Sequence, residues 1–272
     1  MIKLVALDMD GTLLNERQEL GPAVAETIRQ VRARGVRVVL ATGRPLPGVM
    51  NFLPELNLVS DDDYAIPYNG ALVQTTASQK VLIEHSLSYA DYLRLYAQAA
   101  KFGLTMIAED QSAMYTDAPL LTHRELFEAV DTNMAVKFAG PQQIARDIEF
   151  SKIMFFADKP LLDKAMPQLD PKLQTDFYAN RSEDFLLEFV SKHASKGNAL
   201  RELATKLGLQ ADEVMAMGDS HNDVSMFDFA GTGIAMGNAK DELKAIATGV
   251  TASNKDDGVA VALRQYVLDA QQ

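Results

Sequence analysis

Short runs rich in aliphatic residues alternate with amphipathic segments near the start of the chain. Residues 2–7 and 36–41 are such runs, and each is typical of a strand buried on both faces of a parallel sheet. Between them, residues 22–34 predict a helix that begins at a proline and stops before Gly35. Strand, helix and strand in this order predict a βαβ unit with a right-handed crossover. A third short strand is expected over residues 64–68.

The alternation of aliphatic runs with amphipathic segments is weaker in the middle of the chain and is clear again near its end. Strand-like runs at 81–85, 153–157 and 185–190 are less uniformly aliphatic, and helical patterns cover 89–102 and 161–166. After Lys196 the sequence again alternates between helical segments and aliphatic runs. Helices are expected at 198–207 and 224–229 and strands at 214–217, 234–236 and 249–251. We therefore predict an α/β fold. A doubly wound, Rossmann-like core with a parallel sheet is built from residues 1–83 and 192–272, and an α+β cap domain is inserted at 84–191.

Polar clusters follow the predicted core strands. In doubly wound sheets, ligands bind beyond the carboxyl ends of the strands, so these clusters are the candidate site. They are Asp8-Met9-Asp10-Gly11-Thr12, Thr42-Gly43-Arg44, Asn69-Gly70 and Gly218-Asp219-Ser220-His221-Asn222-Asp223.

Charge and composition narrow the range of partners. The net charge of -11 disfavours nucleic acid and anionic membranes, and it also repels phosphorylated small molecules unless local cations attract them. A phosphate site should therefore contain a metal ion, a lysine or both. The absence of cysteine excludes disulfides and thiolate metal sites. With no leader-like start and no apolar run of about 20 residues, a cytoplasmic protein is expected, as a monomer or a homodimer.

Two carboxylates end the first predicted strand. Asp8 and Asp10 repel each other unless a cation or a shared proton relieves them. Gly11 and Thr12 permit a tight turn directly afterwards. An acidic turn that caps a helix is the alternative interpretation, but this motif after an aliphatic strand favours chemistry. A carboxylate can attack phosphorus and form an acyl phosphate.

Such an attack requires neutralisation of charge, because nucleophile and phosphate are both anionic. Mg²⁺ can supply it, and it prefers oxygen ligands. Asp8 and Asp219 can provide carboxylates, and the main-chain carbonyl of Asp10 a third ligand. The side chain of Asp10 is then available as a general acid and base.

Two further segments offer groups that can bind phosphate. The hydroxyl of Thr42 and the N–H of Gly43 can donate to phosphate oxygens, although a simple polar turn would explain them too. Lys196 starts a predicted helix, where a cation is electrostatically unfavourable unless an anion lies nearby. A solvated surface lysine is the alternative, but the overall negative charge favours a role facing phosphate.

The remaining polar residues allow more than one role. Asn222 can bond phosphate and Asp223 can orient the lysine or hold metal-bound water, and both can also cap a helix. Arg44 can contact substrate or form a surface ion pair, and Asn69 is a second candidate for contacting or supporting the substrate. His221 is a tempting acid, but a lone histidine in a loop is more often incidental.

Four segments of the chain, in sequence order, resemble the four motifs of the haloacid dehalogenase superfamily. They are Asp8-Met9-Asp10-Gly11-Thr12-Leu13-Leu14, Thr42-Gly43-Arg44, Lys196-Gly197 and Gly218-Asp219-x-x-Asn222-Asp223. The insertion resembles the C2 cap of the Cof-type subfamily, and within it YidA-like sugar phosphatases. The resemblance implies that Asp8 is the nucleophile and Asp10 the general acid and base. It implies Mg²⁺ held by Asp8, the Asp10 carbonyl and Asp219. It also implies phosphate-binding groups, which are the Met9 backbone, Thr42, Gly43, Lys196 and Asn222.

The sequence-based hypothesis is thus a phosphatase acting on small phosphorylated metabolites, of which sugar phosphates are the first choice. A phosphotransferase such as a phosphomutase would use the same Asp8. A receiver module or a sugar-phosphate-binding regulator without turnover is a further alternative, although a receiver module needs neither Asp10 nor a large insertion. Asn180, Arg181 and Glu188 are candidate substrate contacts in the cap.

Overall fold

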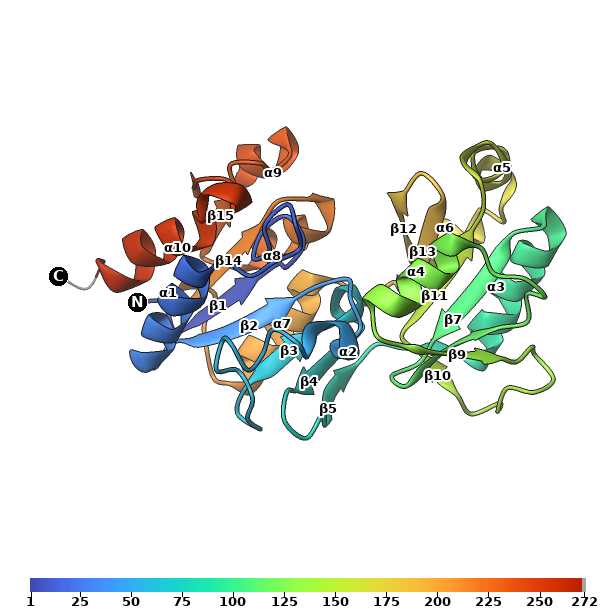
Figure 1. Ribbon diagram of the computed structural model, residues 1–272, viewed down its shortest axis with the longest axis horizontal. Coiled ribbons are helices and arrows are strands. Elements are labelled where there is room, and N and C mark those ends of the chain that lie inside the picture. The colour runs from blue at the N-terminus through green and yellow to red at the C-terminus, as the bar shows by residue number, and fades with distance from the viewer. Residues whose placement is uncertain (271–272) are drawn as a thin grey trace. The chain divides into compact units, whose positions relative to one another are not determined.

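The computed structural model describes residues 1–270, and its internal contacts divide the chain into two compact units (Figure 1). The first, here called the core, comprises Met1–Gly43, Val49–Glu84 and the chain from Ser195 onward. The second, here called the cap, comprises His85–Ala194 together with the short segment Arg44–Gly48. The predicted fold class, a doubly wound parallel-sheet core with an inserted α+β module, is confirmed.

The core contains an eight-stranded sheet in the order β16-β15-β14-β1-β2-β3-β4-β5. The strands are β1 (Leu4–Leu7), β2 (Arg37–Ala41), β3 (Tyr64–Ile66), β4 (Leu72–Thr75), β5 (Val81–Glu84), β14 (Val214–Gly218), β15 (Thr232–Ala235) and β16 (Gly249–Val250). The pairs from β16 to β3 are parallel, and β4 and β5 add an antiparallel edge. Strand β1 lies between β14 and β2 and is wholly buried, which is why its sequence is uninterrupted aliphatic.

Helices cover the core sheet. They are α1 (Pro22–Ala33), α7 (Lys196–Lys206), α8 (Val224–Phe229), α9 (Asp241–Ile246) and α10 (Gly258–Leu263), with the short α2 (Leu46–Val49) at the boundary between the units. Helix α1 starts at Pro22 as predicted and buries Val24, Ile28 and Val31, which recur at the three- and four-residue spacing of one helix face. In the described residues, no helix combines the length and apolar character that crossing a membrane requires.

The cap is built on a six-stranded sheet in the order β12-β13-β11-β7-β8-β9. These strands are β7 (Thr105–Glu109), β8 (Ala113–Thr116), β9 (Ala135–Phe138), β11 (Lys152–Phe156), β12 (Phe177–Glu183) and β13 (Leu186–Ser191). A separate pair joins β6 (Leu87–Ser88) to β10 (Glu149–Phe150). The helices are α3 (Tyr89–Phe102), α4 (His123–Asp131), α5 (Lys159–Ala165) and α6 (Lys172–Asp176).

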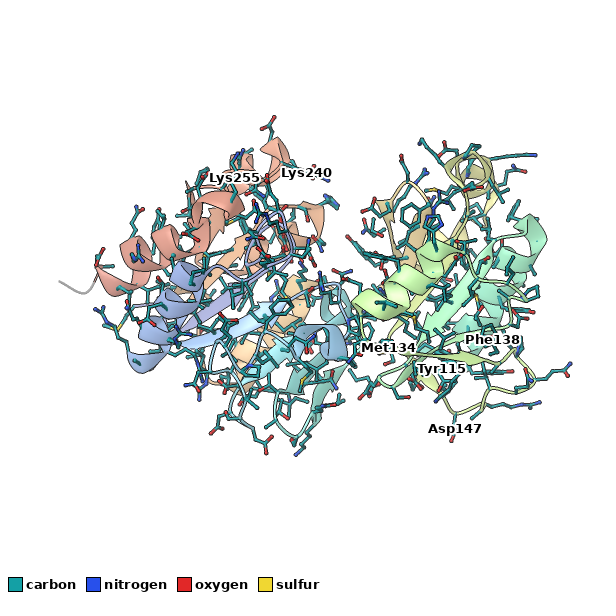
Figure 2. All side chains as sticks on the ribbon, in the orientation of Figure 1. Tyr115, Met134, Phe138, Asp147, Lys240 and Lys255 are labelled. Atoms are coloured by element: carbon teal, nitrogen blue, oxygen red, sulfur yellow. The ribbon has the colours of Figure 1, made fainter. Side chains whose placement is uncertain are left out.

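Alternate residues of the cap strands pack on opposite faces of the sheet. Ile153 and Phe155 join a cluster that includes Leu95 of α3. Met154 points to the other face, in a smaller cluster with Ala129 of α4 and with Met134, which Figure 2 labels. The run at 81–85 resembles the cap strands in texture, but β5 pairs with β4 in the core sheet, the domain to which residues 81–83 were assigned by prediction.

Candidate active site

The parallel strands bring the predicted polar clusters to one edge of the core sheet. Leu7 lies in register with Met217 on one side and with Leu40 on the other. The residues that follow these strands are therefore neighbours, and Asp8 donates its backbone N–H to the carbonyl of Met217 at 3.0 Å. The prediction that Asp8 and Asp219 lie together at the carboxyl ends of the strands is confirmed.

Three carboxylates meet at this edge. Asp8, Asp219 and Asp223 each offer one oxygen, and these oxygens lie within 4.8 Å of one another. Asp8 and Asp223 are buried, and Asp219 is partly exposed. Burial and the nearby Asp223 carboxylate raise the pKa of Asp8 and of Asp219, because crowding and desolvation both disfavour the ionised forms.

A buried lysine partly compensates this charge. The Nζ of Lys196 donates to Asp8 Oδ1 at 2.5 Å and to Asp223 Oδ1 at 2.7 Å, and its side chain has no exposed surface. Burial alone would lower the pKa of Lys196, but the carboxylates of Asp223 and Asp8 outweigh it and raise that pKa. The residue therefore stays a cation, as the sequence argument required of a phosphate site.

Asp223 is fully engaged by the protein. While its Oδ1 accepts from Lys196, its Oδ2 accepts the backbone N–H groups of Asp219 and Ser220, both at 3.0 Å. Its carboxylate thus fixes both the lysine and the turn that carries Asp219. The oxygens of Asp8 and Asp219 are left as the better placed ligands for a cation.

Gly11 allows Asp219 to approach the loop after β1. Its φ is +82°, and a Cβ at this position would lie 2.6 Å from Oδ2 of Asp219. The next residue, Thr12, donates its hydroxyl to Oδ1 of Asp219 at 3.1 Å. Sequence reasoning assigned Thr12 only to a turn and missed this contact, although its place in the acidic motif was the available signal.

The donor set suits a divalent metal ion. Three carboxylates face one ammonium group, so an excess of two negative charges remains when all are ionised. The donors are hard oxygens, the type that Mg²⁺ and Ca²⁺ select. Asp8 and Asp219 would hold the ion, and Asp223 would orient their surroundings.

The rest of the loop after β1 is arranged differently. The side chain of Asp10 is exposed and lies outside the carboxylate cluster, and its backbone pairs with that of Leu14. Met9 is buried, and its carbonyl accepts the N–H groups of Thr12 and Leu14. The loop is further tied to Asn238, whose side chain donates to the Gly11 carbonyl at 2.8 Å. Lys240, labelled near α9 in Figure 2, donates its backbone N–H to the Asp219 carbonyl.

The second and fourth clusters meet through Asn69. The Thr42 carbonyl accepts the Asn69 N–H at 2.8 Å, and a Cβ on Gly43 would lie 3.3 Å from the Asn69 amide nitrogen. The Oδ1 of Asn69 accepts from the side chain of Asn222 at 3.0 Å. The structure thus brings Thr42, Gly43, Asn69 and Asn222 together at the edge that carries Asp8.

Two other candidates have partners of their own. Arg44 belongs to the cap by its contacts, and its guanidinium lies 3.4 Å from the Asp131 carboxylate, which matches the ion-pair interpretation. His221 is exposed and its ring lies 3.3 Å from Glu242.

The candidate cap contacts also have partners within the cap. Arg181 bonds to Asp163 and to the Asp184 carbonyl, and Glu188 is buried 3.0 Å from the ammonium of Lys152. Asn180 lies opposite Glu188 in the strand register. Glu188 therefore has an ion-pair partner in the interior of the cap, and its contact with substrate stays a prediction.

Comparisons with known proteins agree with the motifs. A model of the haloacid dehalogenase-like hydrolases matches residues 5–263. The chain is 39% identical to the putative phosphatase YxeH of Bacillus subtilis, over 98% of this chain and 99% of the relative. It is 32% identical to the B. subtilis 5-amino-6-(5-phospho-D-ribitylamino)uracil phosphatase YcsE, over 98% of this chain and 96% of that one. A haloacid dehalogenase-like hydrolase from Bacteroides thetaiotaomicron superposes with a TM-score of 0.88 at 31% identity, covering 97% of this chain and 99% of the other.

Proposed function

The chain belongs to the haloacid dehalogenase-like hydrolase family, and from this premise we propose that it is a magnesium-dependent phosphatase of small phosphorylated metabolites. One observation carries the proposal. The buried ammonium of Lys196 touches Asp8, and Asp8 lies beside Asp219 at the carboxyl edge of the core sheet. A carboxylate held between a fixed cation and a metal-binding carboxylate suits attack on an anionic phosphorus centre.

In the proposed reaction, an oxygen of Asp8 attacks the phosphorus of the ester. The bond from phosphorus to the ester oxygen breaks, and the leaving alkoxide takes a proton from Asp10. In the second half, Asp10 removes a proton from water, and the resulting hydroxide attacks the same phosphorus. Orthophosphate leaves and the Asp8 carboxylate is regenerated. The exposed position of the Asp10 side chain leaves it accessible to the leaving group and to water.

The groups around Asp8 would bind the phosphoryl oxygens. Lys196 supplies a charge-assisted bond, and the hydroxyl of Thr42, the N–H groups of Met9 and Gly43 and the amide of Asn222 supply neutral donors. Bound Mg²⁺, held by Asp8, Asp219 and the Asp10 carbonyl, would neutralise part of the charge on the phosphoryl group.

The name of one relative supports a choice of substrate class. YcsE, by its name, acts on a uracil derivative with phosphate on a ribityl chain. A phosphorylated polyol or sugar is the corresponding class for this chain.

The test is release of orthophosphate by the purified protein. We expect hydrolysis of p-nitrophenyl phosphate and of a panel of sugar phosphates with Mg²⁺, and its loss with EDTA. The variant Asp8→Asn, which keeps the size of the side chain, should lose turnover and keep the thermal unfolding temperature within a few degrees. Wild-type rates in Asp8→Asn would refute the assignment. Phosphate transferred to a second hydroxyl without release of orthophosphate would instead identify a phosphotransferase.

A further inference from the structure

The loop after β3 has an unusual backbone. Tyr68, Asn69 and Gly70 have φ values of 52°, 54° and 92°. Residues other than glycine seldom adopt this left-handed region, although asparagine tolerates it better than most. Such conformations persist where the surroundings over-determine them, and they are concentrated at functional sites. The contacts of this loop therefore indicate what its shape serves.

Two segments of the site hold the loop in place. The N–H of Asn69 donates to the Thr42 carbonyl at 2.8 Å, which ties the loop to the end of β2. A Cβ on Gly70 would lie 2.2 Å from the carbonyl oxygen of Ser195 and 2.9 Å from the backbone nitrogen of Lys196. The loop is thus packed directly against the start of α7, and no side chain fits between them.

The side chain of Asn69 reaches a third segment. Its Oδ1 accepts from Asn222 Nδ2 at 3.0 Å, while Asn222 Oδ1 accepts the hydroxyl of Ser220 at 2.6 Å. Asn69 is only 5% exposed, so water competes little for this bond. An amide nitrogen carries two hydrogens, so one N–H of Asn222 remains for a ligand once Asn69 holds the other.

We propose that Asn69 is a positioning residue that orients the Asn222 amide, so that its second N–H donates to a phosphoryl oxygen of the substrate. This inference rests on the proposed function. Without the Asn69 oxygen, the Asn222 amide can rotate away from the phosphate. Removing the partner that orients a site residue typically lowers activity by about 10- to 100-fold, and we expect a loss of that size.

The key variant is Asn69→Gly, because glycine keeps the left-handed backbone and removes only the amide. The matched control is Asn57→Gly, since Asn57 also has a positive φ, of 57°, but is exposed in another core loop. We expect kcat/KM for p-nitrophenyl phosphate to fall in Asn69→Gly and to be unchanged in Asn57→Gly. Thermal unfolding of both variants separates loss of activity from loss of fold.

A double-mutant cycle tests whether Asn69 acts through Asn222. If it does, Asn69→Gly combined with Asn222→Ala should be no less active than Asn222→Ala alone, within about twofold. The same pattern should hold for the inhibition constant of inorganic phosphate. If the two losses multiply, Asn69 acts independently of Asn222 and the inference is wrong.

A binding measurement separates this inference from the proposed function. Inorganic phosphate is titrated with Mg²⁺ into ¹⁵N-labelled protein, and the side-chain amide signal of Asn222 is followed. We expect a shift in the wild type and a weaker phosphate affinity in Asn69→Gly. If the wild type shows this response and Asn69→Gly binds phosphate more weakly, but there is no turnover, the proposed function fails and the positioning role stands. If Asn69→Gly binds phosphate as tightly as the wild type, the positioning role fails. If turnover is present but Asn222 does not respond to phosphate, the positioning role fails alone. If both are absent, both fail.

Discussion

Replacing Glu109 with glutamine is expected to change how the stability of the cap depends on pH. Glu109 ends β7 and is fully buried, and neither of its carboxylate oxygens accepts a hydrogen bond from the described residues. The nearest cation is Lys152 on β11, 3.7 Å away. That ammonium lies closer to Glu188, at 3.0 Å, and to Glu128, at 3.4 Å. One lysine therefore serves three glutamates, and Glu109 is the least well compensated.

The sign of the effect follows from the pKa of Glu109. Burial, together with the charges of Glu128 and Glu188, raises that pKa from 4.5 to about 7 against the attraction of Lys152. The folded protein therefore binds this proton more tightly than the unfolded chain. The contribution of Glu109 to the free energy of unfolding is therefore greatest below pH 4.5, decreases as the pH rises towards 7 and is constant above it. A shift of this size corresponds to about 3 kcal/mol.

Lys152 does not titrate in the same range. Burial lowers its pKa, but Glu109, Glu188 and Glu128 together raise it well above 10.5, so it stays charged at neutral pH. Because glutamine cannot ionise, Glu109→Gln should exceed the wild type in stability by only about 1 kcal/mol at pH 5 but by about 3 kcal/mol at pH 8. Asp8 and Asp219 also make stability depend on pH, but they do so equally in both proteins, so their effects cancel in the difference between the variant and the wild type.

The assay is urea unfolding followed by circular dichroism at pH 5 and pH 8. Hydrogen exchange of the β7 and β11 peptides would localise the change to the cap. The matched control is Glu183→Gln, because Glu183 is exposed on β12 of the same sheet. If the wild type and Glu109→Gln lose stability equally between pH 5 and pH 8, the proton is not held at Glu109 and the reasoning is refuted.

Two further pairs of variants test the core site. Gly11→Ala should weaken activation by Mg²⁺ at least about tenfold, because its Cβ would lie 2.6 Å from Asp219 Oδ2. The control is Gly35→Ala, because Gly35 has nearly the same φ, +81°, and its added Cβ would have no atom within 4 Å. It should cost only about 1 to 2 kcal/mol of stability and leave magnesium activation unchanged. Equal magnesium titrations of the two variants would contradict the proposed effect of Gly11 on Asp219. Lys196→Met should lower kcat by about 10²- to 10³-fold, whereas Lys192→Met on the exposed surface should not; similar rates in both would remove Lys196 from the reaction.

The core was more predictable from sequence than the cap for a physical reason. Strands buried on both faces must be apolar throughout, so β1 and β14 were visible as aliphatic runs. In the cap, strands carry buried charges that hide this signal. Lys152 at the start of β11 is 2% exposed and Glu109 in β7 is 0% exposed, and the two lie opposite each other in the strand register. No single-sequence pattern reveals such a pair.

Helix α4 was missed for a related reason. Phe127 is 68% exposed and Glu125 is only 3% exposed, which reverses the usual amphipathic pattern. Glu125 is buried because it forms a capping box with Thr122 at the start of the helix. The capping box therefore explains why a charged residue, Glu125, is buried in this helix.

The site itself was predictable wherever it depends on strand ends. Parallel strands deliver their carboxyl ends to one edge, so Asp8, Thr42 and Asp219 could be grouped without coordinates. The contact between Asn69 and Asn222 joins residues 153 positions apart and could not be read from sequence. Neither could the close approach of Gly70 to the start of α7, which depends on the packing of two separate segments.

The charge balance of the site explains why one lysine is not sufficient for the proposed reaction. Lys196 is fully buried and already bonded to two carboxylates, so its charge is largely cancelled at long range. The whole chain carries a net charge of -11, which opposes the approach of any phosphate ester. Attraction must therefore begin within a few ångströms of Asp8 and Asp219, where a divalent ion would cancel the two excess negative charges of the site. The role left for Lys196 is to stabilise charge once the phosphoryl group has arrived.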